Sequence, residues 1–213
     1  MPARLIRWQG VDVVKKNIII LLALLLGCGV RGTGYSQEEA AGMKKKVVMI
    51  VAQSDFRDEE LLEPKAILER NGIEVKIAST SLSSSRGMLG AEVNPDILVS
   101  DINIRDFAAI ILIGGIGASQ YWDDSITHRL IQEAVSSDRL VAAICIAPVT
   151  LARAGVLKGR RATVWSSEAD KLKSAQANYT GRPVERDGNI ITASGPTAAR
   201  EFADEILEAI RQR

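Results

Sequence analysis

The sequence predicts an α/β fold in which a mostly parallel β-sheet is covered by helices on both faces. Short, unbroken apolar runs recur through residues 44–213, and such runs are typical of strands buried on both sides. Segments with a helical period of apolar residues separate these runs, which favours parallel strands joined by crossover helices. The region has the length of one ordinary domain.

The first three predicted elements are two strands and the helix between them. Residues 47–52 (VVMIVA) form an apolar run and are expected to be the first strand. Residues 58–70 have helical apolar spacing, and an Asn-Gly pair ends this helix. Pro64 lies inside the helix and is expected to bend it. Residues 74–79 form the next strand.

The later elements continue the alternation of strands and helices. In chain order we expect a polar loop at residues 81–86, a strand at 109–113 (AIILI), a helix at 125–136, a strand at 140–144 (LVAAI), a helix at 147–154, short strands at 162–164 and 189–193, and a closing helix at 197–211. In open parallel sheets, ligands bind beyond the carboxyl ends of the strands. Three such ends draw attention: residues 53–60, residues 114–119 and Cys145.

Cys145 lies at a predicted corner between a strand and a helix. Small residues surround it, and Pro148 suits the first turn of the helix. The pattern resembles a nucleophile elbow in which Ala143 and Ala147 replace the glycines of G-x-S-x-G. The amino end of a helix favours a thiolate, so we expect the pKa of this thiol to lie below its usual value. By position alone, a buried structural cysteine fits equally well.

Residues 1–28 have the pattern of a lipoprotein-type export signal. Two lysines precede the apolar run 18–26, which is too short to span a bilayer but matches a secretory signal. The run leads into Leu-Leu-Gly-Cys28, which looks like a bacterial lipoprotein signal with Cys28 as the lipidated residue. Residues 29–43 read as a flexible tether. We therefore expect an exported protein of the bacterial cell envelope that contacts the membrane only through this lipid anchor.

A second reading of the N-terminal region is a later start of translation. Met43 directly precedes three lysines and the first predicted strand, so a cytoplasmic protein could begin there. The order of basic, apolar and small residues before a cysteine rarely arises by chance, and it favours export.

Composition and charge exclude several classes of protein. Of the 213 residues, 46% are hydrophobic and 25% are charged, which is typical of a globular protein. Residues 44–213 hold 22 basic and 23 acidic side chains. The domain therefore has no excess of positive charge of the kind that binds nucleic acid. Two cysteines cannot build a disulfide scaffold. No phosphate-binding loop or usual zinc site is evident, so we expect neither cofactor nor metal.

Four segments together resemble the superfamily of PfpI-type intracellular proteases, Parkinson disease protein 7 and deglycases. They are VVMIVAQSDFRDEELLEP, LIGGIGA, AAICIAP and a strand end reading GPTAA. The resemblance covers roughly residues 46–211, which is essentially the whole predicted domain, residues 44–213. It implies a flavodoxin-like three-layer sandwich, similar to that of glutamine amidotransferases. It also implies a homodimer or a higher homo-oligomer.

The resemblance implies the site residues as well. Cys145 matches the reactive cysteine, and Glu60 matches the acidic residue whose carboxyl contacts the sulfur. Without the resemblance, Glu60 fits a solvated carboxylate in the first turn of a helix better. The main-chain amides around Gly115, Ile116 and Ile146 match the candidate oxyanion site.

Two positions depart from the superfamily's pattern. Members with peptidase character carry a histidine directly after the cysteine, where this chain has Ile146. Deglycase-like members carry a histidine at the position of Trp165. The single histidine, His128, lies inside a predicted helix and fits a surface residue. A Cys–His dyad is therefore not supported. Glu60 could transfer one proton and Arg57 could add charge.

Three functions remain in competition. The leading hypothesis is a glyoxalase- or deglycase-like enzyme that acts on small reactive carbonyls or their adducts. Cys145 would add to the carbonyl carbon, Glu60 would move protons, and the elbow amides would hold the oxyanion. The second hypothesis is a non-catalytic thiol redox sensor or stress-protective protein. The third, a cysteine peptidase, is disfavoured by the missing histidine.

Overall fold

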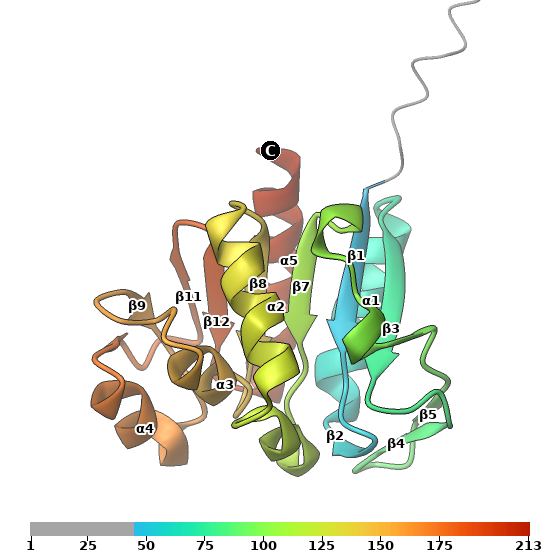
Figure 1. Cartoon of the computed structure of the whole chain (residues 1–213), viewed down its shortest axis with the longest axis horizontal. Coiled ribbons are helices and arrows are strands. Elements are labelled where there is room, and N and C mark those ends of the chain that lie inside the picture. Colours follow the sequence, from blue (N-terminus) through green and yellow to red (C-terminus); the bar gives the residue numbers. More distant parts are fainter. Residues whose placement is uncertain (1–44) are drawn as a thin grey trace, which may run out of the picture. The chain divides into compact units, whose positions relative to one another are not determined.

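A seven-stranded β-sheet forms the centre of the described residues, which in this computed structural model are residues 45–213 (Figure 1). The strand order is β11-β12-β8-β7-β1-β3-β6, and every neighbouring pair is parallel except β11 and β12. The strands are β1 (Lys46–Ile50), β3 (Glu74–Ser79), β6 (Ile97–Leu98), β7 (Ala109–Leu112), β8 (Leu140–Ile144), β11 (Val184–Asp187) and β12 (Ile190–Ala193). The mostly parallel sheet predicted from the sequence is confirmed.

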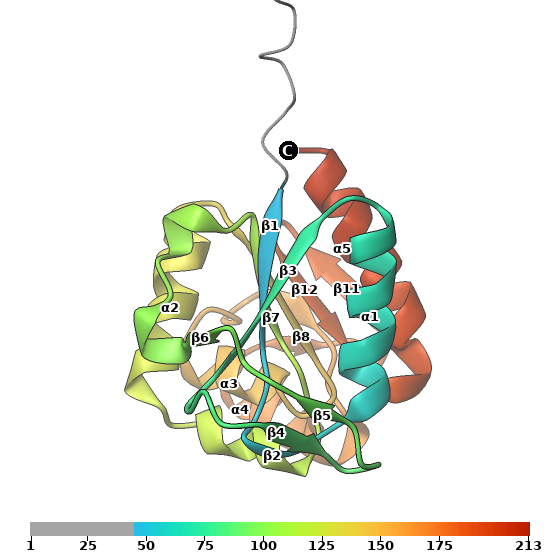
Figure 2. The same ribbon diagram turned by 90° about the vertical axis from the view of Figure 1, so that its right-hand side faces the viewer.

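Helices cover both faces of this sheet, as Figure 2 shows. One face is covered by α1 (Asp58–Arg70) and α5 (Ala199–Arg211), which pack against each other. The other face is covered by α2 (Ser125–Ser136), α3 (Pro148–Arg153) and α4 (Ala169–Ser174). The three layers are those of a flavodoxin-like sandwich, and the predicted fold class is confirmed.

The first strand shows why these strands are apolar throughout. Val47 and Met49 belong to the core beneath α1 and α5, whereas Val48 and Ile50 belong to the core on the opposite face. Successive side chains of a strand point to opposite faces, and here both faces are covered. No position in the centre of the strand is therefore left for a solvated side chain.

Two smaller sheets correct the sequence expectations. One consists of β2 (Ser54–Phe56), β4 (Ser85–Gly87) and β5 (Glu92–Val93), so the expected loop at residues 81–86 runs into a strand. The other consists of β9 (Arg161–Ala162) and β10 (Asn178–Tyr179), so the strand expected at 162–164 is shifted and pairs outside the main sheet. These strands are too short and too polar to produce an apolar run, and tertiary contacts set their pairing.

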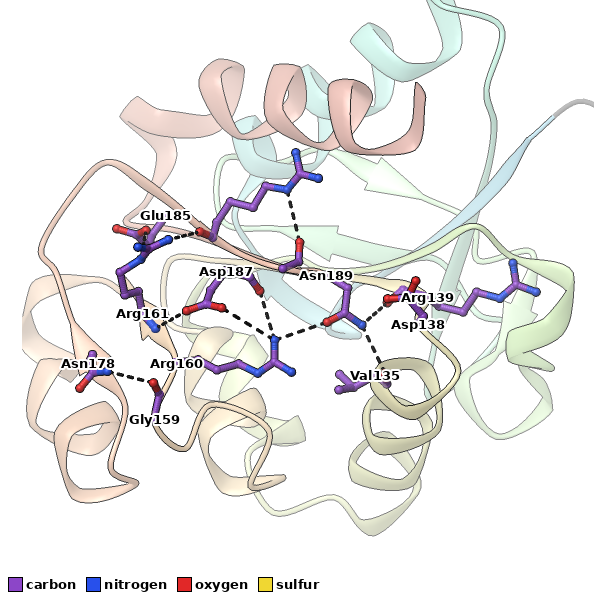
Figure 3. A network of polar contacts seen from close by, with 12 residues as sticks. Val135, Asp138, Arg139, Gly159, Arg160, Arg161, Asn178, Glu185, Asp187 and Asn189 are labelled. Atoms are coloured by element: carbon purple, nitrogen blue, oxygen red, sulfur yellow. Dashed lines mark hydrogen bonds and ion pairs between the residues drawn. The ribbon is translucent and has the colours of Figure 1, made fainter. Parts of the chain in front are cut away.

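A polar network fixes the β9–β10 sheet to the outer strands of the main sheet (Figure 3). The Arg161 side chain donates to the buried carboxylate of Glu185 over 3.0 Å, and its main-chain N–H donates to Asp187 over 2.9 Å. Two residues later the N–H of Thr163 donates to the hydroxyl of Thr192 over 2.9 Å. The network therefore anchors the segment that leads to Trp165.

Several predictions concern residues outside the described part of the chain. These are the signal at residues 1–28, the tether at residues 29–43, the lipidation of Cys28 and the alternative start at Met43. Within residues 45–213, none of the helices combines the length and the apolar character needed to cross a bilayer.

Candidate functional site

The loops that follow the carboxyl ends of several strands meet around a pocket of about 240 Å³. This volume lies just below the range of about 300–1,000 Å³ that is typical of drug-sized ligands. The lining is mostly apolar, and the residues that form it are Arg57, Met88, Gly115, Ile116, Cys145, Ile146, Trp165 and Pro196. The site expected beyond the strand ends is therefore a small pocket with a thiol in its wall.

Cys145 occupies a strained corner between β8 and α3. Its φ angle of 62° lies in the left-handed region, which side chains other than glycine rarely adopt. Its N–H donates to Ala193 over 2.9 Å, and its carbonyl accepts from the N–H of Trp165 over 2.8 Å. Gly114 makes room for the corner, because a Cβ there would lie 2.5 Å from the Cβ of Cys145. The geometry is that of the predicted nucleophile elbow.

Glu60 is a buried acid beside the sulfur rather than a solvated helix carboxylate. It lies in the first turn of α1, which runs without a break across Pro64, and its side chain is fully buried. Its Oε2 accepts from the N–H of Gly114 over 3.1 Å, while Oε1 has no hydrogen-bond partner among the described residues. Burial raises the pKa of Glu60 to about 8, although contacts with the Cys145 thiol and the Gly114 amide oppose this. A protonated carboxyl at neutral pH follows.

The thiol itself does not have the low pKa that the sequence suggested. Burial is the largest cause, and together with the neighbouring Glu60 charge it raises the pKa of Cys145 to about 12. The expectation was wrong because α3 has only six residues and its dipole does not offset the loss of water around the sulfur. The Cys145 thiol and the Glu60 carboxyl interact strongly, so the titration near pH 8 describes the two groups together and not one of them alone.

Two main-chain amides approach the sulfur from different loops. The main-chain N–H groups of Gly115 and Ile146 lower the pKa of Cys145 in opposition to burial. Gly115 has a φ of 93°, and a Cβ there would lie 2.4 Å from the main-chain N of Arg57, so only glycine fits. These amides are positioned to stabilise negative charge on the sulfur or on an oxygen attached beside it. Ile116 contributes its side chain to the rim of the pocket.

Arg57 lies at the same pocket, with its guanidinium paired to Glu59. Its Nε and Nη2 donate to the two carboxylate oxygens over 2.8 and 3.0 Å. The pKa of Arg57 is raised, chiefly by this hydrogen bond. Its main-chain N–H donates to the carbonyl of Gly114 over 3.0 Å. Arg57 thus joins the β1–α1 segment to the glycine loop that carries one of the two amides.

Comparison with known protein families identifies the chain. The model of the DJ-1/PfpI family matches residues 45–209. The chain belongs to the DJ-1/PfpI family. A solved structure of a ThiJ/PfpI domain protein from Brachyspira murdochii is 31% identical, and it superposes with a TM-score of 0.77 over 79% of this chain and 97% of that chain.

Three individual relatives align with most of this chain, and two of them carry enzyme names. An uncharacterized protein from Methanocaldococcus jannaschii is 43% identical over 93% of this chain and 98% of its own length. Deglycase PfpI from Pyrococcus furiosus is 30% identical over 77% of this chain and 99% of its own length. The glutathione-independent glyoxalase DJR-1.2 from Caenorhabditis elegans is 28% identical over 78% of this chain and 89% of its own length.

The two positions that depart from the superfamily's pattern both lie at the pocket. Ile146 directly follows the cysteine, and Trp165 also lines the pocket, with its N–H bonded to the Cys145 carbonyl. His128 is in α2, where its Nε2 lies 2.8 Å from the carbonyl of Trp122, and it does not line the pocket. No histidine within residues 45–213 therefore reaches the thiol.

Sequence reasoning missed two pocket residues, Met88 and Pro196. Met88 follows β4 on a turn held by Asp58, whose carboxylate accepts from the N–H groups of Leu89 and Ala91 over 2.8 and 2.7 Å. Neither the buried Asp58 nor the turn produces an apolar pattern that could have revealed the contact. Pro196 follows β12 in the segment GPTAA, which contributed to the resemblance without being assigned to the site.

A metal site is not evident in residues 45–213, where no three or more His, Cys, Asp and Glu side chains are grouped suitably to hold an ion.

Proposed function

We propose that this protein is a glyoxalase- or deglycase-like enzyme that acts on small reactive carbonyl compounds through Cys145. One observation carries the proposal: a strained thiol in a small apolar pocket contacts a buried carboxyl whose pKa is raised to about 8. The names of the Pyrococcus furiosus deglycase and the Caenorhabditis elegans glyoxalase support the same substrate class.

The first step is addition of the thiol to an aldehyde. A bond forms between the sulfur and the carbonyl carbon, and the electron pair of the C=O bond moves to the oxygen. The proton that leaves the thiol reaches this oxygen by way of Glu60, so the product is a neutral hemithioacetal. The amides of Gly115 and Ile146 stabilise the oxygen while its charge develops. Conversion of an oxoaldehyde to a hydroxy acid then needs only water, since the net reaction is a hydration.

The geometry favours this reaction over peptide hydrolysis. A peptidase must protonate an amine leaving group, and no histidine within residues 45–213 lies near the sulfur for that purpose. Addition to an aldehyde releases no amine, so one proton-transferring carboxyl suffices. The small volume of the pocket also suits a compact molecule better than a peptide chain.

The geometry also weakens the redox-sensor hypothesis. Oxidation to a sulfenic acid depends on thiolate character and exposure. The Cys145 side chain is buried, and its pKa is raised to about 12. Slow oxidation at neutral pH is the expected behaviour.

Turnover of methylglyoxal by the purified protein tests the proposed function. We expect lactate to form with the wild type and not with Cys145→Ser, and we expect no Cys145-dependent cleavage of peptides. Absence of lactate formation with rapid peroxide oxidation of Cys145 would instead establish the redox role. Peptide cleavage that is lost in Cys145→Ser would establish the peptidase.

We propose further that the protein forms a homodimer, as the resemblance implies. Large apolar side chains outside the pocket are exposed on the described domain, namely Leu62, Leu82 and Leu89. Their burial between two copies would remove this apolar surface from water. Light scattering after size-exclusion chromatography distinguishes a dimer from a monomer, and a monomer at micromolar concentration would contradict the proposal.

We also propose export and lipidation at Cys28. The proposal rests on the sequence pattern of two lysines, an apolar run at residues 18–26 and Leu-Leu-Gly-Cys28. In a bacterial host, the wild type should fractionate with membranes and carry lipid on Cys28, whereas Cys28→Ser should not. A soluble product that begins at Met43 would contradict this proposal.

A further inference from the structure

The side chains around the thiol leave an unusual amount of apolar surface open to solvent. Ile116 is 69% exposed, Trp165 is 45% exposed and Met88 is 37% exposed. All three line the pocket that contains Cys145, together with the apolar side chains of Ile146 and Pro196. Exposed apolar groups that gather around a reactive atom mark a surface that an apolar ligand can cover.

The indole of Trp165 is a fixed wall of this pocket rather than a mobile surface group. Its ring rests on Gly195, where a Cβ would lie 2.7 Å from the ring carbon Cε3. Its main-chain N–H is bonded to the carbonyl of Cys145 over 2.8 Å. An aromatic ring is thereby held in the lining of the pocket that contains the thiol.

The polar groups of the pocket are already engaged. Arg57 donates two hydrogen bonds to Glu59, so its charge is compensated within the protein. The Cys145–Glu60 pair carries no net charge at neutral pH. The pocket therefore offers no free cation for a carboxylate or a phosphate group of a substrate.

The volume leaves room beyond the reacting carbonyl. At roughly 30 Å³ per water-sized group, the space of about 240 Å³ holds about eight such groups. Methylglyoxal consists of two carbonyl groups and one methyl group, so it fills only part of this space. A larger apolar substituent would reach Met88, Ile116 and the indole of Trp165.

We propose that the site selects uncharged α-oxoaldehydes with a branched alkyl or aryl substituent, and that Trp165 is the specificity-determining residue. This inference rests on the proposed function and adds the class of substrate. In the adduct, the aldehyde carbon is bonded to the Cys145 sulfur and its oxygen carries the former thiol proton. The ketone carbon holds the apolar substituent against the indole.

The first experiment compares kcat/KM for glyoxylate, methylglyoxal, isobutylglyoxal and phenylglyoxal. We expect isobutylglyoxal to exceed methylglyoxal by at least about tenfold, because isobutyl has three more carbons than methyl and their burial contributes at least a factor of this size. Glyoxylate should be the poorest substrate. Trp165→Ala should reduce the isobutyl-to-methyl ratio toward one, and Trp165→Phe should keep most of it. Leu89→Ala is the matched control, because Leu89 is exposed on the turn beside Met88 but does not line the pocket.

The second experiment measures the same selectivity without turnover. The rates at which N-methylmaleimide and N-cyclohexylmaleimide alkylate Cys145 are each divided by their rates with glutathione. A cyclohexyl preference that disappears in Trp165→Ala and persists in Leu89→Ala supports the apolar pocket.

The two readouts separate the inference from the function on which it rests. Turnover of methylglyoxal with no preference for larger substituents in either experiment overturns the inference and leaves the proposed function intact. A Trp165-dependent maleimide preference without turnover of any oxoaldehyde supports the apolar selectivity of the pocket and overturns the proposed function.

Discussion

Cys145 and Glu60 retain their protons at neutral pH because the fold removes both from water and places them together. Each charge would be poorly solvated, and each would repel the other. The carboxyl has the lower pKa and loses its proton first, and its charge then helps to keep the proton on the sulfur. Glu60 therefore controls how much nucleophile is present above pH 8.

The pH dependence of alkylation should report this coupling. For the wild type, we expect the rate constant of iodoacetamide alkylation to rise through an inflection near pH 8, where the pair loses its first proton. Glu60→Leu should lose this inflection and react faster than the wild type at pH 8.5, because the carboxylate charge that raises the pKa of the thiol is gone. Glu60→Gln keeps a donor and should react faster than Glu60→Leu. Identical profiles for all three proteins would show that the carboxyl is not coupled to the sulfur.

A histidine at position 165 should add an acid–base group to the site. Trp165→His places an imidazole, which has an ordinary pKa of about 6.5, in the lining of the pocket. We expect kcat for methylglyoxal to rise by about tenfold or more, with a new inflection near pH 6.5 in the rate profile. At the same time, selectivity for apolar substituents should fall. An unchanged pH profile would mean that the imidazole does not reach the reacting atoms.

At the scale of single residues, the sequence predicted site residues where an uncommon residue type occurs at a particular place in an element. A cysteine at a strand–helix corner, a glycine pair after a buried strand and an acid at the start of a helix are such signals. Met88 and Pro196 carry no comparable signal, because turns that the sequence does not specify bring them to the pocket. The direction of the thiol pKa was also missed, since burial depends on the whole surroundings of the sulfur.

At the scale of elements, the β4–β5 turn depends on one buried carboxylate. Asp58 accepts from the N–H groups of Leu89 and Ala91, and Gly87 leaves it space, since a Cβ there would lie 2.5 Å from its Oδ2. The turn carries Met88 to the pocket. Its position thus follows from the first turn of α1 rather than from its own sequence.

Loss of this carboxylate should destabilise the turn and the protein together. In Asp58→Ala two N–H groups lose their partner, so the free energy of unfolding should fall by about 1–3 kcal/mol. Amide hydrogen exchange at residues 87–91 should accelerate. Glu63→Ala is the control on the same helix, because Glu63 forms only an exposed ion pair with Arg200 and should change stability by less than about 1 kcal/mol. Equal effects of the two substitutions would contradict the anchoring role of Asp58.

The elements differ in how far sequence alone could predict them. The bounds of α1, α2, β3 and β8 agree with the predictions, because long periodic helices and strands buried on both faces leave clear patterns. The strands of the smaller sheets contain polar residues such as Ser54, Arg86 and Arg161. Their conformation follows from pairing with distant segments, which the local pattern does not encode.

At the scale of the whole molecule, stability should depend on pH through Glu60. The pKa of this carboxyl is about 4.3 in an unfolded chain and is raised to about 8 in the folded protein. Between these two pH values the folded state binds a proton at Glu60 that the unfolded state has lost. The resulting contribution to the free energy of unfolding is complete below about pH 4 and is lost as the pH rises through about 8.

Urea unfolding between pH 5 and 8 should reveal this linkage when the wild type is compared with Glu60→Gln. The amide cannot ionise, so its contribution to stability does not change with pH. We expect the free energy of unfolding of the wild type to fall relative to the variant as the pH increases, by up to about 1.4 kcal/mol for each pH unit. A difference that stays constant across this range would mean that Glu60 ionises with an ordinary pKa.

The two ends of the described domain lie at the edge of the sheet opposite the pocket. Lys45 precedes β1 and its Nζ donates to the carbonyl of Ile210 near the end of α5, whereas the thiol follows the carboxyl end of β8 (Figure 1). A short linker could therefore join the two ends without passing over the site. A circular permutant with new termini in a surface loop would then be possible. Attachment to a solid support through either end would likewise leave the mouth of the pocket facing the surrounding solution.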